Sequence, residues 1–86
     1  MNKFLLSSKA KIDLIKIARY SQLTWGIPQR NDYLKVLDST FQLLANEPES
    51  GLNCDYIREG YSKYSQASHV IYYKKYKNNQ IFIVRI

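Results

Sequence analysis

The residues that could carry chemistry in this chain are few and widely spaced. A zinc site needs several converging histidine, cysteine or carboxylate ligands, and the sequence offers one histidine, His69, and one cysteine, Cys54. No nucleophile-elbow sequence accompanies His69, Cys54 or a serine. The glycines Gly26, Gly51 and Gly60 are too scattered to form a phosphate-binding loop. We therefore expect no metal, no cofactor and no catalytic residue of a familiar class.

Basic side chains interleaved with tyrosines are the remaining candidates. Arg58, Lys63 and Arg85 lie in the C-terminal part of the chain, with tyrosines between them. Arginine can bind phosphate and tyrosine can stack on bases, so these residues could bind RNA. Metal-free RNA cleavage would also need a general acid and base, for which His69 and a tyrosine are the candidates. Tyrosine and arginine are equally typical anchors of protein interfaces, so both interpretations stay open here.

The charge balance favours an acidic partner. Thirteen Lys and Arg stand against seven Asp and Glu, which gives a net charge of +6. From Gly60 to the end of the sequence there are basic residues and no acidic one. Such a bias suits nucleic acid or an acidic protein segment. A solvated sheet face made soluble by lysines is the alternative for Lys74, Lys75 and Lys77.

Length and composition indicate one globular domain covering residues 1–86. The chain has 86 residues, of which 45 % are hydrophobic and 14 % aromatic, which places it in the globular class. A single cysteine allows no intrachain disulfide. The apolar run at residues 4–6 is too short for a signal peptide, and no run is long enough to span a membrane. We expect a cytoplasmic protein without a membrane partner.

The first half of the chain predicts a short strand and a helical hairpin. Residues 3–7 are typical of a strand, and Ser7 or Ser8 can cap a helix that runs from Lys9 to Trp25. Gly26 suits the end of that helix. Pro28 suits the first turn of a second helix that ends near Asn46. Because the link is short, the two helices should lie antiparallel.

The second half has the composition of an antiparallel sheet. Tyrosine, valine and isoleucine are enriched in strands, and Asn78-Asn79 suits a tight turn. We predict strands at Tyr56–Tyr64, Ser68–Tyr76 and Gln80–Ile86. The expected fold class is α+β: a short N-terminal strand, an antiparallel helical hairpin and a three-stranded antiparallel meander, with the hairpin packed on one face of the sheet.

The last predicted strand has two largely apolar faces. Alternation places Ile81, Ile83 and Arg85 on one face and Phe82, Val84 and Ile86 on the other. One face can pack against the helices. We expect the face that carries Arg85 to be exposed unless a partner covers it.

Several runs resemble the RelE/ParE toxin superfamily, and within it the ParE branch of type II toxin–antitoxin systems. In the second half these runs are Arg58–Tyr64, Ser68–Tyr73 and Ile81–Ile86. In the first half they are Ala10–Leu14, Ile17-Ala18, Trp25-Gly26 and Leu43–Pro48. The resemblance covers nearly the whole chain and preserves the order of elements predicted above.

The resemblance implies a toxin that acts by binding rather than by catalysis. Toxins of the ParE branch inhibit DNA gyrase, arrest growth and contribute to plasmid or chromosomal stability. The implied partners are DNA gyrase and a cognate acidic ParD-like antitoxin that forms a hetero-oligomer with the toxin. DNA is implied only indirectly, through the antitoxin. The alternative within the superfamily is a RelE-type ribosome-dependent mRNA endonuclease.

The resemblance also suggests site residues. Candidates for target or partner binding are Arg58, Lys63, His69, Tyr73 and Arg85. Candidates for the antitoxin-binding groove are Leu14, Trp25, Tyr33 and Leu37. Ser62 stands where a second arginine is common in the family. Members usually continue past the last strand with a short tail containing a histidine and an acidic residue, so the last residue, Ile86, implies a truncated, weakened form.

Overall fold

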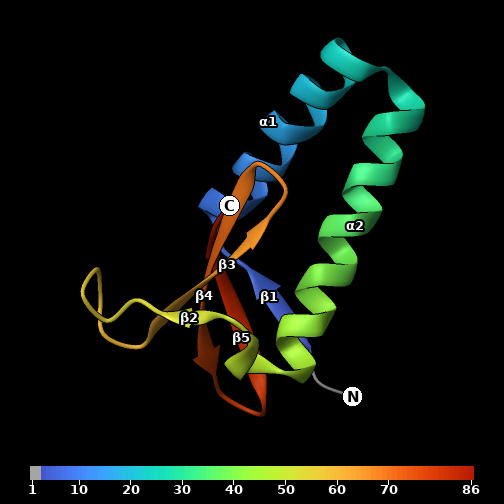
Figure 1. Cartoon of the computed structure of the whole chain (residues 1–86). Helices are drawn as coiled ribbons and strands as arrows, with labels where there is room; N and C mark the ends of the chain where they lie inside the picture. The colour runs from blue at the N-terminus through green and yellow to red at the C-terminus, as the bar shows by residue number, and fades with distance from the viewer. Residues whose placement is uncertain (1–2) are drawn as a thin grey trace.

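Two helices cover one face of a five-stranded mixed sheet in the computed structural model, which describes residues 3–86 (Figure 1). The strands stand in the spatial order β1-β5-β4-β3-β2. The elements along the chain are β1 (Phe4–Leu6), α1 (Ser8–Trp25), α2 (Ile27–Asn46), the short 3₁₀ helix η1 (Pro48–Ser50), β2 (Leu52–Asn53), β3 (Tyr61–Gln66), β4 (His69–Tyr76) and β5 (Gln80–Arg85). The predicted α+β class with a helical hairpin is confirmed.

Local signals fix the ends of both helices. The Ser7 hydroxyl accepts a hydrogen bond from the Ala10 N–H at 2.9 Å, which caps α1. Gly26 has φ of +92°, a value that suits glycine, and its N–H donates to the Gln22 carbonyl at 3.0 Å. Pro28 lies in the first turn of α2. A single residue therefore joins the two antiparallel helices.

The sheet contains two strands more than the predicted meander. β1 pairs in parallel with β5, and Phe4 lies opposite Ile81. β2 pairs with β3, and Leu52 lies opposite Lys63. The antiparallel pairs β3–β4 and β4–β5 form the expected meander. β1 thus continues the sheet on one side and β2 continues it on the other.

The predicted strand at Tyr56–Tyr64 is wrong over its first five residues. Residues 55–60 form successive turns, and the Ile57 N–H donates to the Cys54 carbonyl at 2.9 Å. The Asp55 carboxylate accepts from the Gly60 N–H at 2.8 Å, and Gly60 has φ of +86°. These hydrogen bonds close the loop locally, so Tyr56 and Ile57 lie in turns and pair with no strand, despite their strand propensity.

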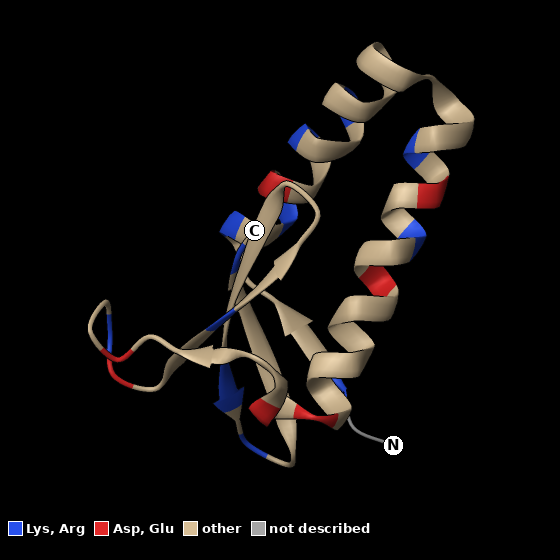
Figure 2. Ribbon diagram, viewed as in Figure 1, with Lys and Arg blue, Asp and Glu red and all other residues tan. Residues whose placement is uncertain are grey.

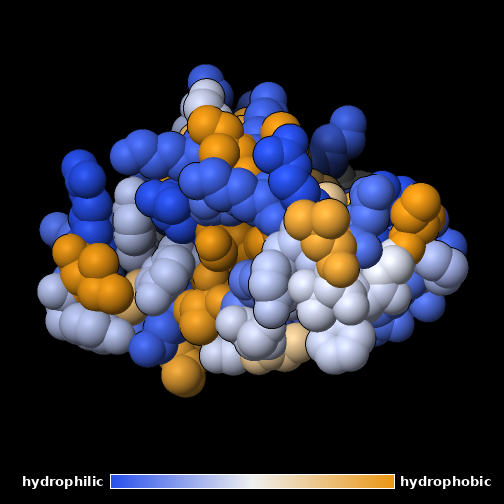
Figure 3. All heavy atoms as spheres, turned by 90° about the horizontal axis from the view of Figure 1, so that it is seen from above, coloured by the Kyte–Doolittle hydropathy of each residue, from blue (hydrophilic) through white to orange (hydrophobic). Residues whose placement is uncertain are grey.

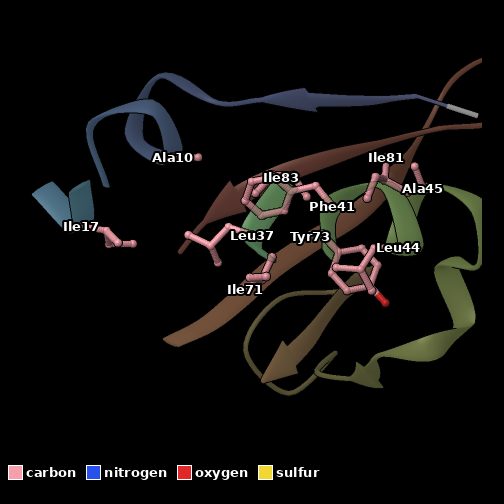
Figure 4. Packing of buried hydrophobic residues seen from close by; sticks show 10 residues of the cluster. All are labelled: Ala10, Ile17, Leu37, Phe41, Leu44, Ala45, Ile71, Tyr73, Ile81 and Ile83. Atoms are coloured by element: carbon pink, nitrogen blue, oxygen red, sulfur yellow. The ribbon is translucent and has the colours of Figure 1, made fainter. Parts of the chain in front are cut away.

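The core lies between the helices and one face of the sheet (Figure 4). Alternate strand residues contribute to it, as expected for a sheet covered on one side. The cluster consists of Ala10, Ile17, Leu37, Phe41, Leu44, Ala45, Ile71, Tyr73, Ile81 and Ile83. No helix within residues 3–86 covers the opposite face of the sheet.

The assignment of faces on the last strand needs correction. We expected the face with Ile81, Ile83 and Arg85 to be exposed. Ile81 and Ile83 are completely buried in the core, so this face of the strand packs against the helices. A bulge between Tyr72 and Tyr73 shifts the β4–β5 register and interrupts strict alternation. As a result, Ile86 also packs against the core.

Neither helix within residues 3–86 has the combination of length and apolar character needed to span a bilayer.

Candidate partner-binding site

A cavity lies where the turn between β3 and β4 meets the helical hairpin. Its volume is about 260 Å³. It brings together three residues that the sequence singled out separately, namely Trp25, Tyr33 and His69. Its full lining is Tyr20, Ser21, Trp25, Gln29, Tyr33, Ala67, Ser68 and His69. We call this the hairpin cavity.

Tyr33 and His69 form the polar side of the hairpin cavity. The Tyr33 hydroxyl lies 2.6 Å from His69 Nδ1 and 3.3 Å from the Gln66 carbonyl oxygen. A neutral imidazole can accept the hydroxyl proton at Nδ1. A protonated imidazole can donate to the same oxygen, and the Tyr33 hydroxyl then donates its hydrogen bond to the Gln66 carbonyl oxygen. The pair therefore has a hydrogen-bonding arrangement in either state. Burial raises the pKa of Tyr33, so this phenol stays neutral.

The rim of the hairpin cavity is apolar and exposed. Trp25 keeps 68 % of its surface accessible, and Tyr20 keeps 66 %. Leu23 and Ile27 are also exposed large side chains near the turn of the hairpin, outside the lining of the cavity. Seen from the end of the hairpin, hydrophobic side chains reach the surface in several patches among hydrophilic ones (Figure 3). Apolar surface gathered around a cavity is typical of a protein-binding site.

Arg85 is held by α1. Its Nε donates to Asp13 Oδ2 at 2.8 Å and its Nη2 donates to Oδ1 at 3.1 Å. The Ile86 N–H donates to Asp13 Oδ2 at 3.0 Å. The hydrogen bond from Arg85 is the main cause that lowers the pKa of Asp13. Asp13 belongs to α1 and its carboxylate is almost buried. The hydrogen bonds from Arg85 and Ile86 to this carboxylate therefore attach the end of β5 to α1.

Two of the predicted contact residues lie in the core. Tyr73 and Leu37 each retain only 1 % of their accessible surface. The Tyr73 hydroxyl donates to the Pro48 carbonyl at 2.6 Å and accepts from the Gly51 N–H at 2.9 Å. Leu14 is partly buried against the same cluster. We therefore assign Tyr73 and Leu37 to packing, because neither side chain offers surface to a partner.

The remaining basic candidates lie apart from the hairpin cavity. Arg58 is exposed in the loop before β3. Lys63 is on β3, and its ammonium donates to the Tyr56 hydroxyl at 3.1 Å. Strand alternation places Lys63 on the side of the sheet away from the helices, opposite Tyr72 of β4. The predicted residues therefore divide between two surfaces.

Sequence reasoning missed most of the second surface. Lys74 lies over two rings, with Nζ 5.9 Å from the centroid of Tyr61 and 5.7 Å from that of Phe82. Tyr76 stacks on Phe82 with ring centroids 5.7 Å apart. We call Tyr61, Lys63, Tyr72, Lys74, Tyr76 and Phe82 the aromatic–lysine face. Its signal was the alternation Tyr72, Lys74, Tyr76, which places all three on one side of β4.

Sequence comparison decides the family. Residues 4–86 match the family described as "ParE toxin of type II toxin-antitoxin system, parDE". The chain belongs to the ParE toxin family. It is therefore a toxin of the type II toxin–antitoxin class, as the resemblance predicted.

Individual ParE proteins show the same relationship. Toxin ParE1 of Caulobacter vibrioides is 36 % identical over 74 residues, which cover 86 % of this chain and 77 % of that toxin. Toxin ParE1 of Mycobacterium tuberculosis is 34 % identical over 85 residues, which cover 99 % of this chain and 87 % of that toxin. Both matches span most of the ParE fold described above.

A solved structure shares the fold. The structure titled "Chromosomal ParDE TA system from P. aeruginosa" superposes with a TM-score of 0.78 and covers 100 % of this chain and 92 % of that chain. Its sequence identity is 17 %. At that identity the likeness establishes the ParE-like arrangement of helices and strands and nothing about individual site residues.

Proposed function

We propose that this ParE-family toxin acts by binding and inhibiting DNA gyrase, and that a cognate acidic ParD-like antitoxin neutralises it. The match to the ParE family over residues 4–86 carries this proposal. The toxin acts as a ligand of its target rather than as an enzyme.

The hairpin cavity is the proposed docking site of the antitoxin. An amphipathic segment can place an apolar side chain in the cavity and cover Trp25 and Tyr20 at its rim. Tryptophan at the rim of a pocket is a frequent interface hot spot. The Tyr33–His69 pair offers a polar contact at the far side of the same cavity.

The charge of the toxin supports an acidic antitoxin. With a net charge of +6, the toxin attracts an acidic segment before contact and accelerates association. An antitoxin segment that is disordered in isolation could fold on binding, stabilised by contacts between its apolar side chains and the rim of the hairpin cavity.

Growth arrest and antitoxin binding test the proposal together. We expect induction of the chain in a bacterial host to stop growth and co-expression of the antitoxin to restore it. In calorimetry, Trp25→Ala should weaken antitoxin binding by about 2 kcal/mol or more, as expected for a hot spot. Ile57→Ala removes another exposed apolar side chain, from the loop before β3, and should leave the affinity unchanged.

Two results would contradict this account. Equal losses from Trp25→Ala and Ile57→Ala would show that the antitoxin does not dock at the hairpin cavity. Continued growth despite accumulation of the folded chain would show that it is not a toxin of the proposed kind.

A further inference from the structure

The side of the sheet away from the helices combines rings with ammonium groups. Tyr61 and Lys74 lie opposite each other on β3 and β4, and Lys74 lies opposite Phe82 on β5. Lys63 lies opposite Tyr72 in the same way. Three neighbouring strands thus present one continuous array, and Figure 2 shows the basic residues along β3, at the end of β4 and in the turn after it.

The lysines of this surface have no carboxylate partner among the described residues. The two ion pairs within residues 3–86 join Lys75 to Glu49 and Arg85 to Asp13. Lys74 and Lys77 instead lie over aromatic rings, Lys77 at 5.6 Å from the centroid of Tyr76. At the margin, Glu49, Asp55 and Glu59 line a hollow together with Lys74, but none of them forms an ion pair with it. Glu49 pairs with Lys75, and the Asp55 carboxylate accepts from the Gly60 N–H. Positive charge on the face is therefore available to an anionic ligand.

Rings and ammonium groups in alternation suit one class of ligand. Single-stranded nucleic acid exposes base faces that stack on aromatic side chains and phosphates that pair with lysine, without dependence on sequence. Lys74 lies over Phe82 and Lys77 over Tyr76, so these ring faces become available when the lysines turn to the ligand. Bases can then take the place of the ammonium groups on the rings, whereas an acidic peptide has no flat groups that could do so. Double-stranded DNA also hides its base faces, so it can use only the charge.

We propose that the aromatic–lysine face binds single-stranded DNA, with the rings of Tyr76 and Phe82 stacking on bases and Lys63 and Lys74 pairing with phosphates. This differs from the expectation that the toxin reaches DNA only through its antitoxin. The choice of DNA over RNA rests on the proposed function, because the proposed target acts on DNA. The choice of a single strand rests on the rings of the face alone. The face lies on the opposite side of the sheet from the helices, so it is separate from the hairpin cavity.

Fluorescence anisotropy with a labelled oligo(dT) of about 15 nucleotides tests the proposal, because that length matches a site of this kind. We expect a dissociation constant of about 1–100 μM at low salt, typical of non-specific binding. Tyr76→Ala should weaken binding about fivefold or more, which corresponds to the loss of one stacked base. Lys74→Gln should weaken it and lower the salt dependence by about one phosphate contact.

Lys11→Gln is the matched control, because it removes the same charge from an exposed position on α1 and should have little effect. Circular dichroism confirms that each variant is folded. Equal losses from Lys11→Gln and Lys74→Gln would overturn the proposal, because binding would then follow total charge alone. Equal affinity for the duplex form would overturn it for the same reason.

Two competition experiments separate the other ligands. Poly-glutamate should displace the oligonucleotide poorly, and efficient displacement would assign the face to an acidic protein instead. Tighter binding of oligo(U) than of oligo(dT) would assign it to RNA. The assay contains neither gyrase nor antitoxin, so its failure leaves the proposed function standing, and failure of gyrase inhibition leaves DNA binding by this face open to the same measurement.

Discussion

Asp13 shows how one side chain can fasten two elements that are distant in the sequence. Its carboxylate accepts from two atoms of Arg85 and from the Ile86 N–H. Asp13 retains 10 % of its side-chain surface and Arg85 retains 51 %. The carboxylate is thus mostly buried, while the guanidinium remains half in water. Hydrogen bonds to a charged, largely desolvated group are among the stronger ones in proteins.

Asp13→Asn should reduce the free energy of unfolding by about 1–3 kcal/mol at neutral pH, because the charged acceptor is lost. Urea denaturation followed by circular dichroism measures this change. Asp32→Asn removes a carboxylate from an exposed position on α2 and should change the stability by less than about 0.5 kcal/mol. Similar losses from both variants would contradict the fastening role of Asp13.

Asp13 also predicts how the stability of the fold depends on pH in the acid range. The pKa of Asp13 is lower in the folded state than in the unfolded chain. Its contribution is therefore complete above the unfolded pKa, near 4, and is lost as the pH falls through the folded pKa. Stability measured between about pH 6 and pH 2 should fall less steeply for Asp13→Asn than for the natural chain. Identical slopes would show that this carboxylate titrates alike in both states.

Residue types predicted part of the hairpin cavity. Trp25 and Tyr33 came from the helical half of the chain and His69 from the sheet, and the structure brings them together. Their convergence could not be predicted from spacing, because Tyr33 and His69 are 36 positions apart. Tyr73 and Leu37 show the opposite case. Their types suit an interface, but only the packing of α2 on the sheet reveals that both are buried.

At the level of helices and strands, the sequence predicted element ends correctly where a residue type determines the local backbone geometry. Ser7, Gly26 and Pro28 fixed both helices to within a residue or two. The parallel pairing of β1 with β5 could not be predicted, because it joins residues 4–6 to residues 81–83. The two residues of β2 are too few to produce a pattern. The loop at residues 55–60 was mistaken for strand because its turn bonds come from Asp55 and Gly60, while Tyr56 and Ile57 favour strands.

Two glycines at the edges of β2 and β3 give a test at this level. Gly60 has positive φ and open space around it, so Gly60→Ala should cost about 1 kcal/mol from backbone strain alone. A Cβ at Gly51 would collide with the Tyr73 hydroxyl and come within 2.7 Å of the Lys63 carbonyl oxygen. Gly51→Ala should therefore cost more, about 2–3 kcal/mol. Chemical denaturation of both variants gives the comparison, and a larger loss for Gly60→Ala would show that the Tyr73 contact is not held as described.

The whole molecule presents two different surfaces on opposite sides of one small sheet. The hairpin cavity is apolar at its rim and lies on the helical side. The aromatic–lysine face is basic and lies on the other side. The sequence predicted an excess of positive charge concentrated after Gly60, but not the side of the sheet on which it lies. The family resemblance predicted antitoxin-binding candidates on the helices and named Lys63 among the candidates for target binding. It did not predict that Tyr61, Lys74, Tyr76 and Phe82 form one surface with Lys63.

The measurement that tests the central claim most directly is supercoiling of relaxed plasmid by purified gyrase in the presence of the folded chain. We expect inhibition that rises with toxin concentration and disappears when the antitoxin is added in equal amount. Unchanged supercoiling, together with cleavage of mRNA on translating ribosomes by the same preparation, would contradict the proposal and assign the chain a ribonuclease role.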